Sequence, residues 1–421
     1  MSLSESLREN LCSFFEYKTP KIVHIKSRKV GILNRLIQAV IISYIVGFIL
    51  IYKKGYQEFS GVESSVTTKV KGVLSTRNLT QNDFNDNYIE DMDLYVRIWD
   101  TTDLVVPASE NGAFFVTTNM ILTPNQSLGV CPEDADVSDA VCDPNIKGFC
   151  DDKVFLLGHG IATGKCVNST RKGVYTCEID GWCPVEKDDY PLKDNKPLFT
   201  ATKNFTVLIK NSIRFSDYNI RRRNIIEIDN SSKLRDCTYD PIMNAGCPVF
   251  VLNDIVRWAD QDYDQISQYG GVIGIEINWD CNLDFDLKYC VPKYSFKRLD
   301  DPHTSIAKGW NFRYSNYYDN NRRTLYKATG IRFVLLVSGS AGKFNFIPLV
   351  IKLGSGLGLL AITTIICDIV VLYLNKGGKY YKDKKYQYVE QVNTQYTDMM
   401  AANLRQRTSS DDQRSNNFMD Q

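Results

Sequence analysis

The sequence is poor in the side chains from which metal centres are built. Its 421 residues include only three histidines, His24, His159 and His303, which are scattered along the chain. The twelve cysteines contain no C-x-x-C pair, the spacing typical of zinc sites. The formal net charge is +1, so no long-range field attracts a nucleic acid. We therefore expect no metal, no cofactor and no nucleic-acid partner.

Signatures of common enzymes are also missing. The segment GSAGKF (339–344) resembles part of a phosphate-binding loop, but Val337 stands where a glycine is needed and Phe344 where Ser or Thr is needed. The stretch GSGLG (354–358) fails the dinucleotide-binding pattern. Neither H-E-x-x-H nor G-x-S-x-G occurs. We predict that the protein is not an enzyme.

Two long apolar stretches are the strongest feature of the sequence. The first runs from Ile32 to Tyr52 and the second from Phe346 to Leu374. A helix needs about 20 mostly apolar residues to cross a bilayer, so both stretches are long enough. The alternative for the first stretch is a secretory signal peptide, which has a shorter apolar core and a small-residue cleavage site that is missing here. We predict two membrane-spanning helices.

Basic residues flank the outer ends of both stretches. They are Lys18, Lys21, Lys26, Arg28 and Lys29 before the first, and Lys376, Lys379, Lys382, Lys384 and Lys385 after the second. Basic residues favour the cytoplasmic side, so we expect both termini inside and a plasma-membrane location. The expected parts are a cytoplasmic N-terminus (1–31), a first membrane helix (32–52), an extracellular domain (53–345), a second membrane helix (346–374) and a cytoplasmic tail (375–421).

Cysteines and glycosylation sequons agree with that topology, because ten cysteines and five sequons fall in the predicted extracellular part. The sequons begin at Asn78, Asn125, Asn168, Asn204 and Asn230. An even set of cysteines outside the membrane is typical of disulfides in an oxidising compartment. Six of them form a cysteine-rich segment, residues 131–183, whose pairing the spacing leaves open. Cys12 and Cys367 lie outside this set.

Strand-like segments fill most of the extracellular part. They are DLYVRIWD (93–100), AFFVTTNMIL (113–122), FTVLIKN (205–211), GGVIGIEINWDC (270–281) and GIRFVLLVSG (330–339). Their β-branched and aromatic residues, bounded by Gly, Asn, Asp or Pro, are typical of strands. The segment PVFVLNDIVRWA (248–259) has a short helical character. We predict a β-rich domain with few helices.

Lys69 and Lys71 lie two positions apart in the β-branched run SVTTKVKGVLS (65–75). In a strand they project from one face, where like charges repel. The ordinary interpretation is a lysine-bearing edge strand that resists aggregation. The alternative is an anion site, to which Arg313 in GWNFRYSNYY and Lys327 in RRTLYKATGIRF would contribute. Lysine and arginine both suit phosphate oxygens.

Motifs in a fixed order decide between these alternatives. They are YKTPK (17–21), KVKG (69–72), NFT (204–206), NFRY (311–314), KATGIRF (327–333), GKFNFIP (342–348) and YKDKK (381–385), together with the ten extracellular cysteines. With these motifs the sequence resembles the ATP-gated purinergic (P2X) receptor channels across nearly its whole length. An acid-sensing or epithelial sodium channel has a similar layout but does not need the lysine and arginine set. A non-conducting binding or adhesion receptor is the other alternative.

The resemblance implies an integral membrane protein in which two transmembrane helices flank a β-rich, disulfide-bonded extracellular domain. It also implies assembly in membrane lipid as a homotrimer, or as a trimer with mixed subunits. ATP acts as the agonist and binds at three sites between neighbouring subunits. Binding opens a pore formed by the second helices, through which sodium, potassium and calcium pass.

The resemblance also assigns roles to individual residues. The implied ATP-binding residues are Lys69, Lys71, Thr206, Leu208, Asn311, Arg313 and Lys327. Of these, Thr206 hydrogen-bonds adenine, Leu208 packs near the nucleoside, and the others hold the phosphates. The implied gate positions are Ile351 and Ser355. The implied disulfides are Cys131–Cys183, Cys142–Cys166, Cys150–Cys177, Cys237–Cys247 and Cys281–Cys290.

Three features stand apart from the family pattern. Asp368, a charge within a membrane helix, is a functional candidate in its own right, although a polar contact near the cytoplasmic end is an equal alternative. The linker SNYYDNNRRTLY (315–326) looks short, so we expect an altered loop between two binding strands. The basic run Arg221–Arg223 has no matched role, and we expect it to face solvent.

Overall fold

The computed structural model describes residues 28–151, 154–155, 157–225, 237–304, 308–374 and 378–385. The expectations for the first 27 residues, for the sequon at Asn230 and for the tail beyond Lys385 lie outside these ranges. The chain divides into two compact units. One comprises Glu58–Phe344, and the other comprises the segments before and after it.

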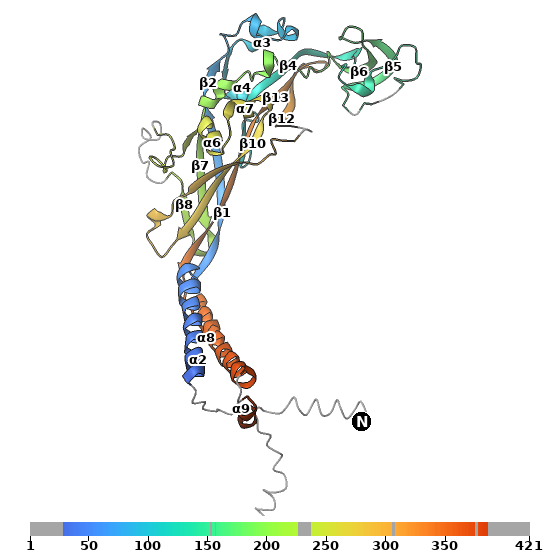
Figure 1. Cartoon of the computed structure of the whole chain (residues 1–421). Helices are drawn as coiled ribbons and strands as arrows, with labels where there is room; N and C mark the ends of the chain where they lie inside the picture. The colour runs from blue at the N-terminus through green and yellow to red at the C-terminus, as the bar shows by residue number, and fades with distance from the viewer. Residues whose placement is uncertain are drawn as a thin grey trace, which may run out of the picture. The chain divides into compact units, whose positions relative to one another are not determined.

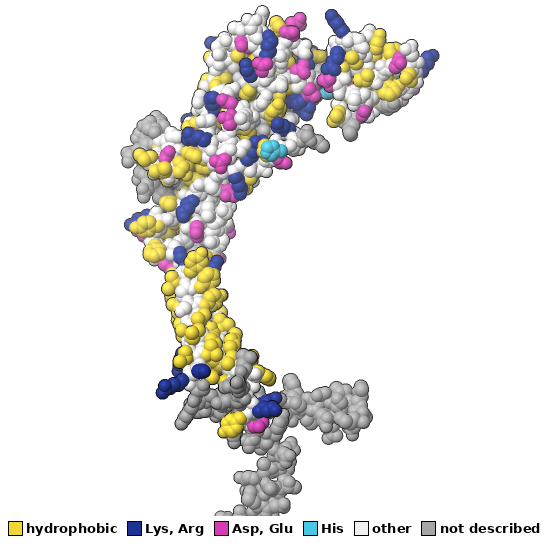
Figure 2. All heavy atoms as spheres, viewed as in Figure 1, with side chains coloured by type: hydrophobic (Ala, Val, Ile, Leu, Met, Phe, Trp, Pro, Cys, Tyr) yellow, Lys and Arg dark blue, Asp and Glu magenta, His cyan; other side chains and the backbone are white. Residues whose placement is uncertain are grey.

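The second unit is built on two long helices. Helix α2 (Arg28–Ser43) continues through the wider turns of η1 (Tyr44–Tyr52), and α8 (Phe346–Ile369) continues through η9 (Val370–Leu374), before the short α9 (Gly378–Lys385). Hydrophobic side chains cover both long helices (Figure 2). By length and composition both are able to cross a membrane. They contain the two apolar stretches that the sequence predicts as spans.

The Glu58–Phe344 unit is mainly β-structure. Its strands are β1 (Gln57–Lys71), β2 (Val73–Ser75), β3 (Ile98–Asp100), β4 (Ala113–Pro132), β5 (Gly160–Asn168), β6 (Tyr175–Cys183), β7 (Thr206–Phe215), β8 (Ile220–Arg223), β9 (Val249–Val251), β10 (Gly271–Asn282), β11 (Lys293–Arg298), β12 (Asn311–Asp319) and β13 (Arg322–Phe344). Its α-helices are α3 (Met92–Tyr95), α4 (Thr101–Leu104), α6 (Leu252–Trp258) and α7 (Tyr263–Tyr269).

One large sheet organises this unit (Figure 1). Its main path runs β5-β6-β4-β13-β1-β7-β8, while β2 and β3 form a separate pair. Strand β13 is the hub, because β10 and β12 also pair with it, the former in parallel. Strand β11 pairs with β10, and β9 pairs with β7. The hub therefore connects the two strand pairs that carry the expected binding residues.

Alternation of buried and exposed residues fixes which face of β7 meets the core. Val207, Ile209, Ile213 and Phe215 are buried and join the main hydrophobic cluster. Asn211, the polar member of this inward series, accepts a 2.6 Å hydrogen bond from the buried Trp279 indole. Because side chains alternate along a strand, the intervening residues of β7 face outward.

One sequence expectation about a strand differs from the structure. DLYVRIWD was expected to be one strand, but its first half belongs to α3 and only its end forms β3. The reason is tertiary, because Tyr95 is fully buried and its hydroxyl accepts a 2.8 Å hydrogen bond from the Leu122 amide. In the linker 315–326, β12 and β13 continue to a two-residue turn.

The cysteine-rich segment, residues 131–183, forms a head with a small core of its own. The five disulfides of the structure join Cys131–Cys183, Cys142–Cys166, Cys150–Cys177, Cys237–Cys247 and Cys281–Cys290, the pairs implied by the family resemblance. The buried core of the head contains few large apolar side chains, so its bridges contribute much of its stability.

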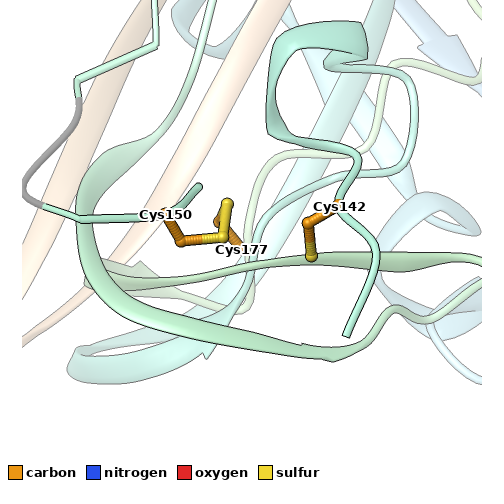
Figure 3. A group of neighbouring side chains, drawn as sticks. All are labelled: Cys142, Cys150 and Cys177. Carbon is orange, nitrogen blue, oxygen red and sulfur yellow. A yellow bond between two sulfur atoms is a disulfide. The ribbon is translucent and has the colours of Figure 1, made fainter. Parts of the chain in front are cut away.

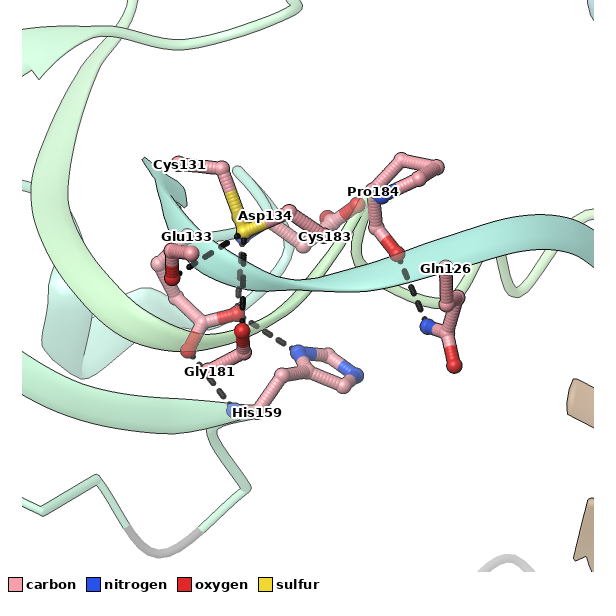
Figure 4. The surroundings of a disulfide bond; sticks show 9 residues. Gln126, Cys131, Glu133, Asp134, His159, Gly181, Cys183 and Pro184 are labelled. Carbon is pink, nitrogen blue, oxygen red and sulfur yellow. Dashed lines mark hydrogen bonds and ion pairs between the residues drawn. A yellow bond between two sulfur atoms is a disulfide. The ribbon is translucent and has the colours of Figure 1, made fainter. Parts of the chain in front are cut away.

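An acidic and a basic side chain of the head pair beside its Cys131–Cys183 bridge (Figure 4). The Glu133 carboxylate, next to the Cys131–Cys183 bridge, accepts hydrogen bonds from the His159 amide at 2.7 Å and from His159 Nδ1 at 2.5 Å. Burial raises the pKa of Glu133, but these bonds outweigh burial and lower it overall, and they raise the pKa of His159. Both shifts favour the charged forms of the pair.

Candidate ATP-binding site and pore helix

Strands β1 and β7 hold the first group of expected ATP-binding residues. In their antiparallel register Lys71 pairs with Thr206, and Lys69 pairs with Leu208. Paired residues, and residues two positions apart, share a face, so all four side chains project together. Both lysines are exposed, and within the described chain neither side chain has an ion pair or hydrogen bond. Their charge is available to a ligand.

Gly72 follows the end of β1, where the residue before β7 approaches its backbone closely. A Cβ atom there would lie 2.1 Å from the ring of Phe205, which is buried and precedes Thr206. Phe205 in turn is anchored by its carbonyl, which accepts a 3.0 Å hydrogen bond from the Leu252 amide. The glycine of the KVKG motif thus lets Lys71 and Thr206 reach the same surface.

Strands β12 and β13 hold the second group. Asn311 pairs with Thr329, and Arg313 pairs with Lys327, so the polar residues share one face. The aromatic residues between them point the other way: Phe312 meets Phe115 at 4.9 Å, and Tyr314 stacks on Tyr326 at 4.8 Å. This alternation explains the order of residues in the NFRY motif, because the rings anchor the strand while its polar residues face outward.

Two carboxylates form ion pairs with the cations of this second group. Glu186 Oε2 accepts a 2.6 Å hydrogen bond from Arg313 Nε, while its Oε1 lies 3.3 Å from Lys327 Nζ without hydrogen-bond geometry. Lys327 also forms an ion pair with Asp188. The Glu186 side chain is 4% exposed and that of Lys327 is 15% exposed, so this is a partly desolvated cluster. The hydrogen bond that Arg313 donates to Glu186 raises the pKa of Arg313.

The carboxylates come from the segment just after the last cysteine of the head. The Gln126 side chain holds this segment by a 2.8 Å hydrogen bond to the Pro184 carbonyl (Figure 4). Gln126 itself accepts from Arg323 Nε at 2.8 Å. Sequence reasoning missed Glu186 and Asp188, and their only signal is the acidic composition of CPVEKDD (183–189). The binding strands are thus coupled to the head.

A single chain does not bring the two groups together through any direct bond. Lys69 and Lys71 lie on β1, whereas Arg313 and Lys327 lie on β12 and β13, and no ion pair or hydrogen bond among the described residues joins one group to the other. A triphosphate held by one group alone meets only two cations. Each group therefore contains only part of the expected set of cations.

The second long helix has one covered face and one free face. Gly356, Thr363 and Cys367 are buried, and a Cβ atom on Gly356 would lie 2.9 Å from Ile45 of the first helix. Ile351 and Ser355 are exposed. Because an α-helix turns by about 100° per residue, they project from a different side of α8 than the three buried residues. Asp368 is half-buried and makes contacts of its own. The expected gate positions therefore lie away from the first helix.

One group of described residues has metal-like spacing but cannot bind a metal as it stands. The sulfurs of Cys142, Cys150 and Cys177 lie within 4.8 Å of one another (Figure 3). All three are in disulfides, with Cys166 as the partner of Cys142 and the other two joined together. Metal ligation requires thiolates, so these cysteines are structural.

Comparison with known proteins agrees with this geometry. The family profile described as ATP P2X receptor matches residues 15–388. The mouse (Mus musculus) P2X purinoceptor 4 is 45% identical over 387 residues, covering 89% of this chain and 94% of the relative. The human P2X purinoceptor 5 is 41% identical over 388 residues, covering 90% of this chain and 83% of the relative.

Solved structures are similar as well. A P2X receptor from the Gulf Coast tick, determined in the presence of ATP and Zn2+, is 51% identical with a TM-score of 0.77, covering 80% of this chain and 100% of that one. The chicken ATP-gated P2X7 receptor channel with the competitive antagonist TNP-ATP is 34% identical with a TM-score of 0.68, covering 81% and 99%. The chain therefore belongs to the ATP P2X receptor family, as an ATP-gated cation channel of the plasma membrane and not an enzyme.

Proposed function

We propose that ATP binds between neighbouring subunits of a trimer, bridging Lys69 and Lys71 of one subunit to Asn311, Arg313 and Lys327 of the next. The observation that carries this proposal is the split of the cations into two groups with no bond between them. Joining the two groups across a subunit boundary provides four cations for one triphosphate. The negative charge of a triphosphate requires several cations when no metal ion neutralises part of it. Thr206 and Leu208 stand beside the lysines, where they meet the adenine and nucleoside.

In this proposal, the carboxylates of Glu186 and Asp188 bind Arg313 and Lys327 when ATP is absent, in the positions that phosphates take when ATP is bound. A phosphate arriving at Arg313 and Lys327 replaces the carboxylate oxygens and releases the segment after Cys183. ATP shifts the channel toward the open state only by its different affinity for the two states. The exchange of carboxylate for phosphate is a source of such a difference, because it changes how the head segment is held.

The pore is formed in this proposal by three copies of α8, with Ile351 and Ser355 facing the axis. A hydrophobic ring closes such a pore by dewetting, and the small residues at Gly354 and Gly358, open on the free face, let neighbouring helices approach. Sodium, potassium and calcium pass when the helices separate. The termini lie in the cytoplasm and residues 53–345 outside, with glycans accessible at the exposed Asn78, Asn125, Asn168 and Asn204.

Replacing Glu186 with glutamine is expected to make the channel more sensitive to ATP. The amide keeps the size of the side chain but removes the charge that competes with phosphate at Arg313 and Lys327. We expect the ATP concentration for half-maximal current to fall by about tenfold, which corresponds to about 1.4 kcal/mol. Whole-cell recording of ATP concentration–response curves measures the shift.

A matched control is Glu178→Gln in the head. Glu178 also forms an ion pair, with Lys165 at 3.2 Å, but lies on β6 away from the expected phosphate residues. Its ATP curve is expected to stay in place. A rightward shift in Glu186→Gln would show that Glu186 supports the bound state. Equal shifts in both variants would show an effect that is not specific to Glu186. Either result contradicts competition between Glu186 and ATP.

A further inference from the structure

The basic run Arg221–Arg223 is divided between two faces of the sheet. It forms β8, in which Arg223 pairs with Ser212 and Arg221 pairs with Arg214. Arg222 points to the opposite face, where its guanidinium donates to the Cys290 carbonyl at 3.3 Å. The expectation of a uniformly solvent-facing run is therefore wrong for Arg222, which is half-buried.

The face that carries Arg223 continues to the expected phosphate lysines. Its cross-strand rows, in order, are Lys71–Thr206, Lys69–Leu208, Thr67–Lys210 and Ser65–Ser212–Arg223. Successive rows lie about 7 Å apart, because each advances two residues along a strand. The cations Lys71, Lys69, Lys210 and Arg223 thus follow one another on a single exposed surface.

A groove lies over the last two rows. Its volume is about 290 Å³. The exposed residues of its lining are Ser65, Thr67, Lys210, Ser212 and Arg223, and the less exposed ones are Asn211, Asn224 and Ile225. That volume is at the small end for ligand sites, about 300–1,000 Å³, so it suits a short chain of small groups. The lining offers three hydroxyl donors, one ammonium and one guanidinium, a set suited to phosphate oxygens.

Among the residues that the structure describes, no carboxylate neutralises the charge in this groove. Within the described chain, the side chains of Lys210 and Arg223 have no ion pair or hydrogen bond. Along these rows of described residues, a carboxylate first appears in the next row, where Glu63 pairs with Arg214 and Arg214 pairs with Arg221. Protection of an edge strand explains an arginine on β8. It does not explain Lys210, because β7 lies between β1 and β8 and is not an edge.

We propose that the groove is a second phosphate-binding subsite, which takes polyphosphate chains longer than the triphosphate of ATP. A chain bound at Lys69 and Lys71 continues over Lys210 to Arg223, with the hydroxyls of Ser65 and Thr67 as further donors. The proposal rests on the assignment of Lys69 and Lys71 to phosphates under the proposed function. Arg223 and Lys210 add a preference for chain length that the ATP residues alone do not have.

Binding to the purified full-length receptor tests the subsite. The probe is inorganic polyphosphate long enough to span the four rows, about 20 Å, and labelled ATP is the reference ligand. Arg223→Gln and Lys210→Gln are each expected to weaken polyphosphate binding by about tenfold, the effect of one charged hydrogen bond. Neither is expected to change ATP binding. Arg221→Gln, on the same strand and face but in the row that contains Arg214 and Glu63, is the matched control and should change neither ligand.

Each other outcome has a definite meaning. Unchanged polyphosphate binding in Arg223→Gln overturns the subsite. Equal losses in Arg223→Gln and Arg221→Gln also overturn it, because they indicate a diffuse charge effect. If heparin binds as tightly as polyphosphate and is lost in the same variants, the groove serves a sulfated macromolecule instead. Normal ATP binding in Lys71→Ala refutes the ATP-site assignment, and the Arg223→Gln result then stands alone as a test of the groove.

Discussion

Replacing Lys71 with alanine is expected to raise the ATP concentration for half-maximal current by roughly ten- to over a hundredfold, because a hydrogen bond to a charged group contributes about 1.5–3 kcal/mol. The Lys71 side chain is exposed and has no bond of its own within the described residues, so its loss should not affect folding. Surface expression should therefore remain normal. Recording of ATP-evoked currents, with surface labelling in the same cells, measures both quantities.

Lys293→Ala is the matched control for Lys71. Lys293 is also exposed and lies on β11, away from the four strands that carry the expected phosphate residues. Its ATP curve should be unchanged. A normal ATP response of Lys71→Ala would show that Lys71 is not the phosphate ligand that the site requires. Failure to reach the cell surface would show that Lys71 supports folding, contrary to this expectation.

The Ser355→Cys channel is expected to lose nearly all of its current when a charged thiol reagent reacts with it. This block should develop much faster with ATP than without it. Ser355 lies one helical turn beyond Ile351, on the face of α8 that the first helix leaves free. A closed hydrophobic ring at Ile351 excludes the charged reagent, and opening admits it. Recording the rate of block in both conditions, in a background that carries Cys367→Ala, gives the comparison.

Thr363→Cys is the control for this experiment, because Thr363 is fully buried on the same helix. It should react slowly with or without ATP. Equal rates for Ser355→Cys in both conditions would place the gate elsewhere. Block at Ile42 or Ile45 of the first helix, with none in the second, would overturn the choice of pore helix.

Features that depend on local periodicity could be read from the sequence. The two membrane helices follow from the length of their apolar runs. The shared face of Lys69 and Lys71 follows from the two-residue period of a strand. The alternation in NFRY likewise separates Arg313 from its aromatic neighbours.

Features that depend on distant parts of the chain could not. Glu186 reaches Arg313 across 127 residues, and nothing local to either residue predicts that contact. The helical start of DLYVRIWD depends on the burial of Tyr95 against β4. The disulfide pairs were implied only by the family resemblance, since their spacing leaves several pairings open. The ion pairs of Glu186 and Asp188 with Arg313 and Lys327 form only because the fold brings β12, β13 and the end of the head together.

The split of the ATP site between subunits is tested most directly by mixing two defective subunits. Lys71→Ala damages the β1 half of a site, and Arg313→Ala damages the β12 half. In a mixed trimer, an Arg313→Ala subunit keeps an intact β1 half, and a Lys71→Ala subunit keeps an intact β12 half. The site is complete at each subunit boundary where these two intact halves meet. The measurement is labelled ATP binding to purified, co-assembled receptor, compared with each variant alone. We expect high-affinity ATP binding to return in the mixture, although neither variant shows it by itself. If the mixture binds ATP no better than the separate variants, the two halves lie within one subunit and the account is contradicted.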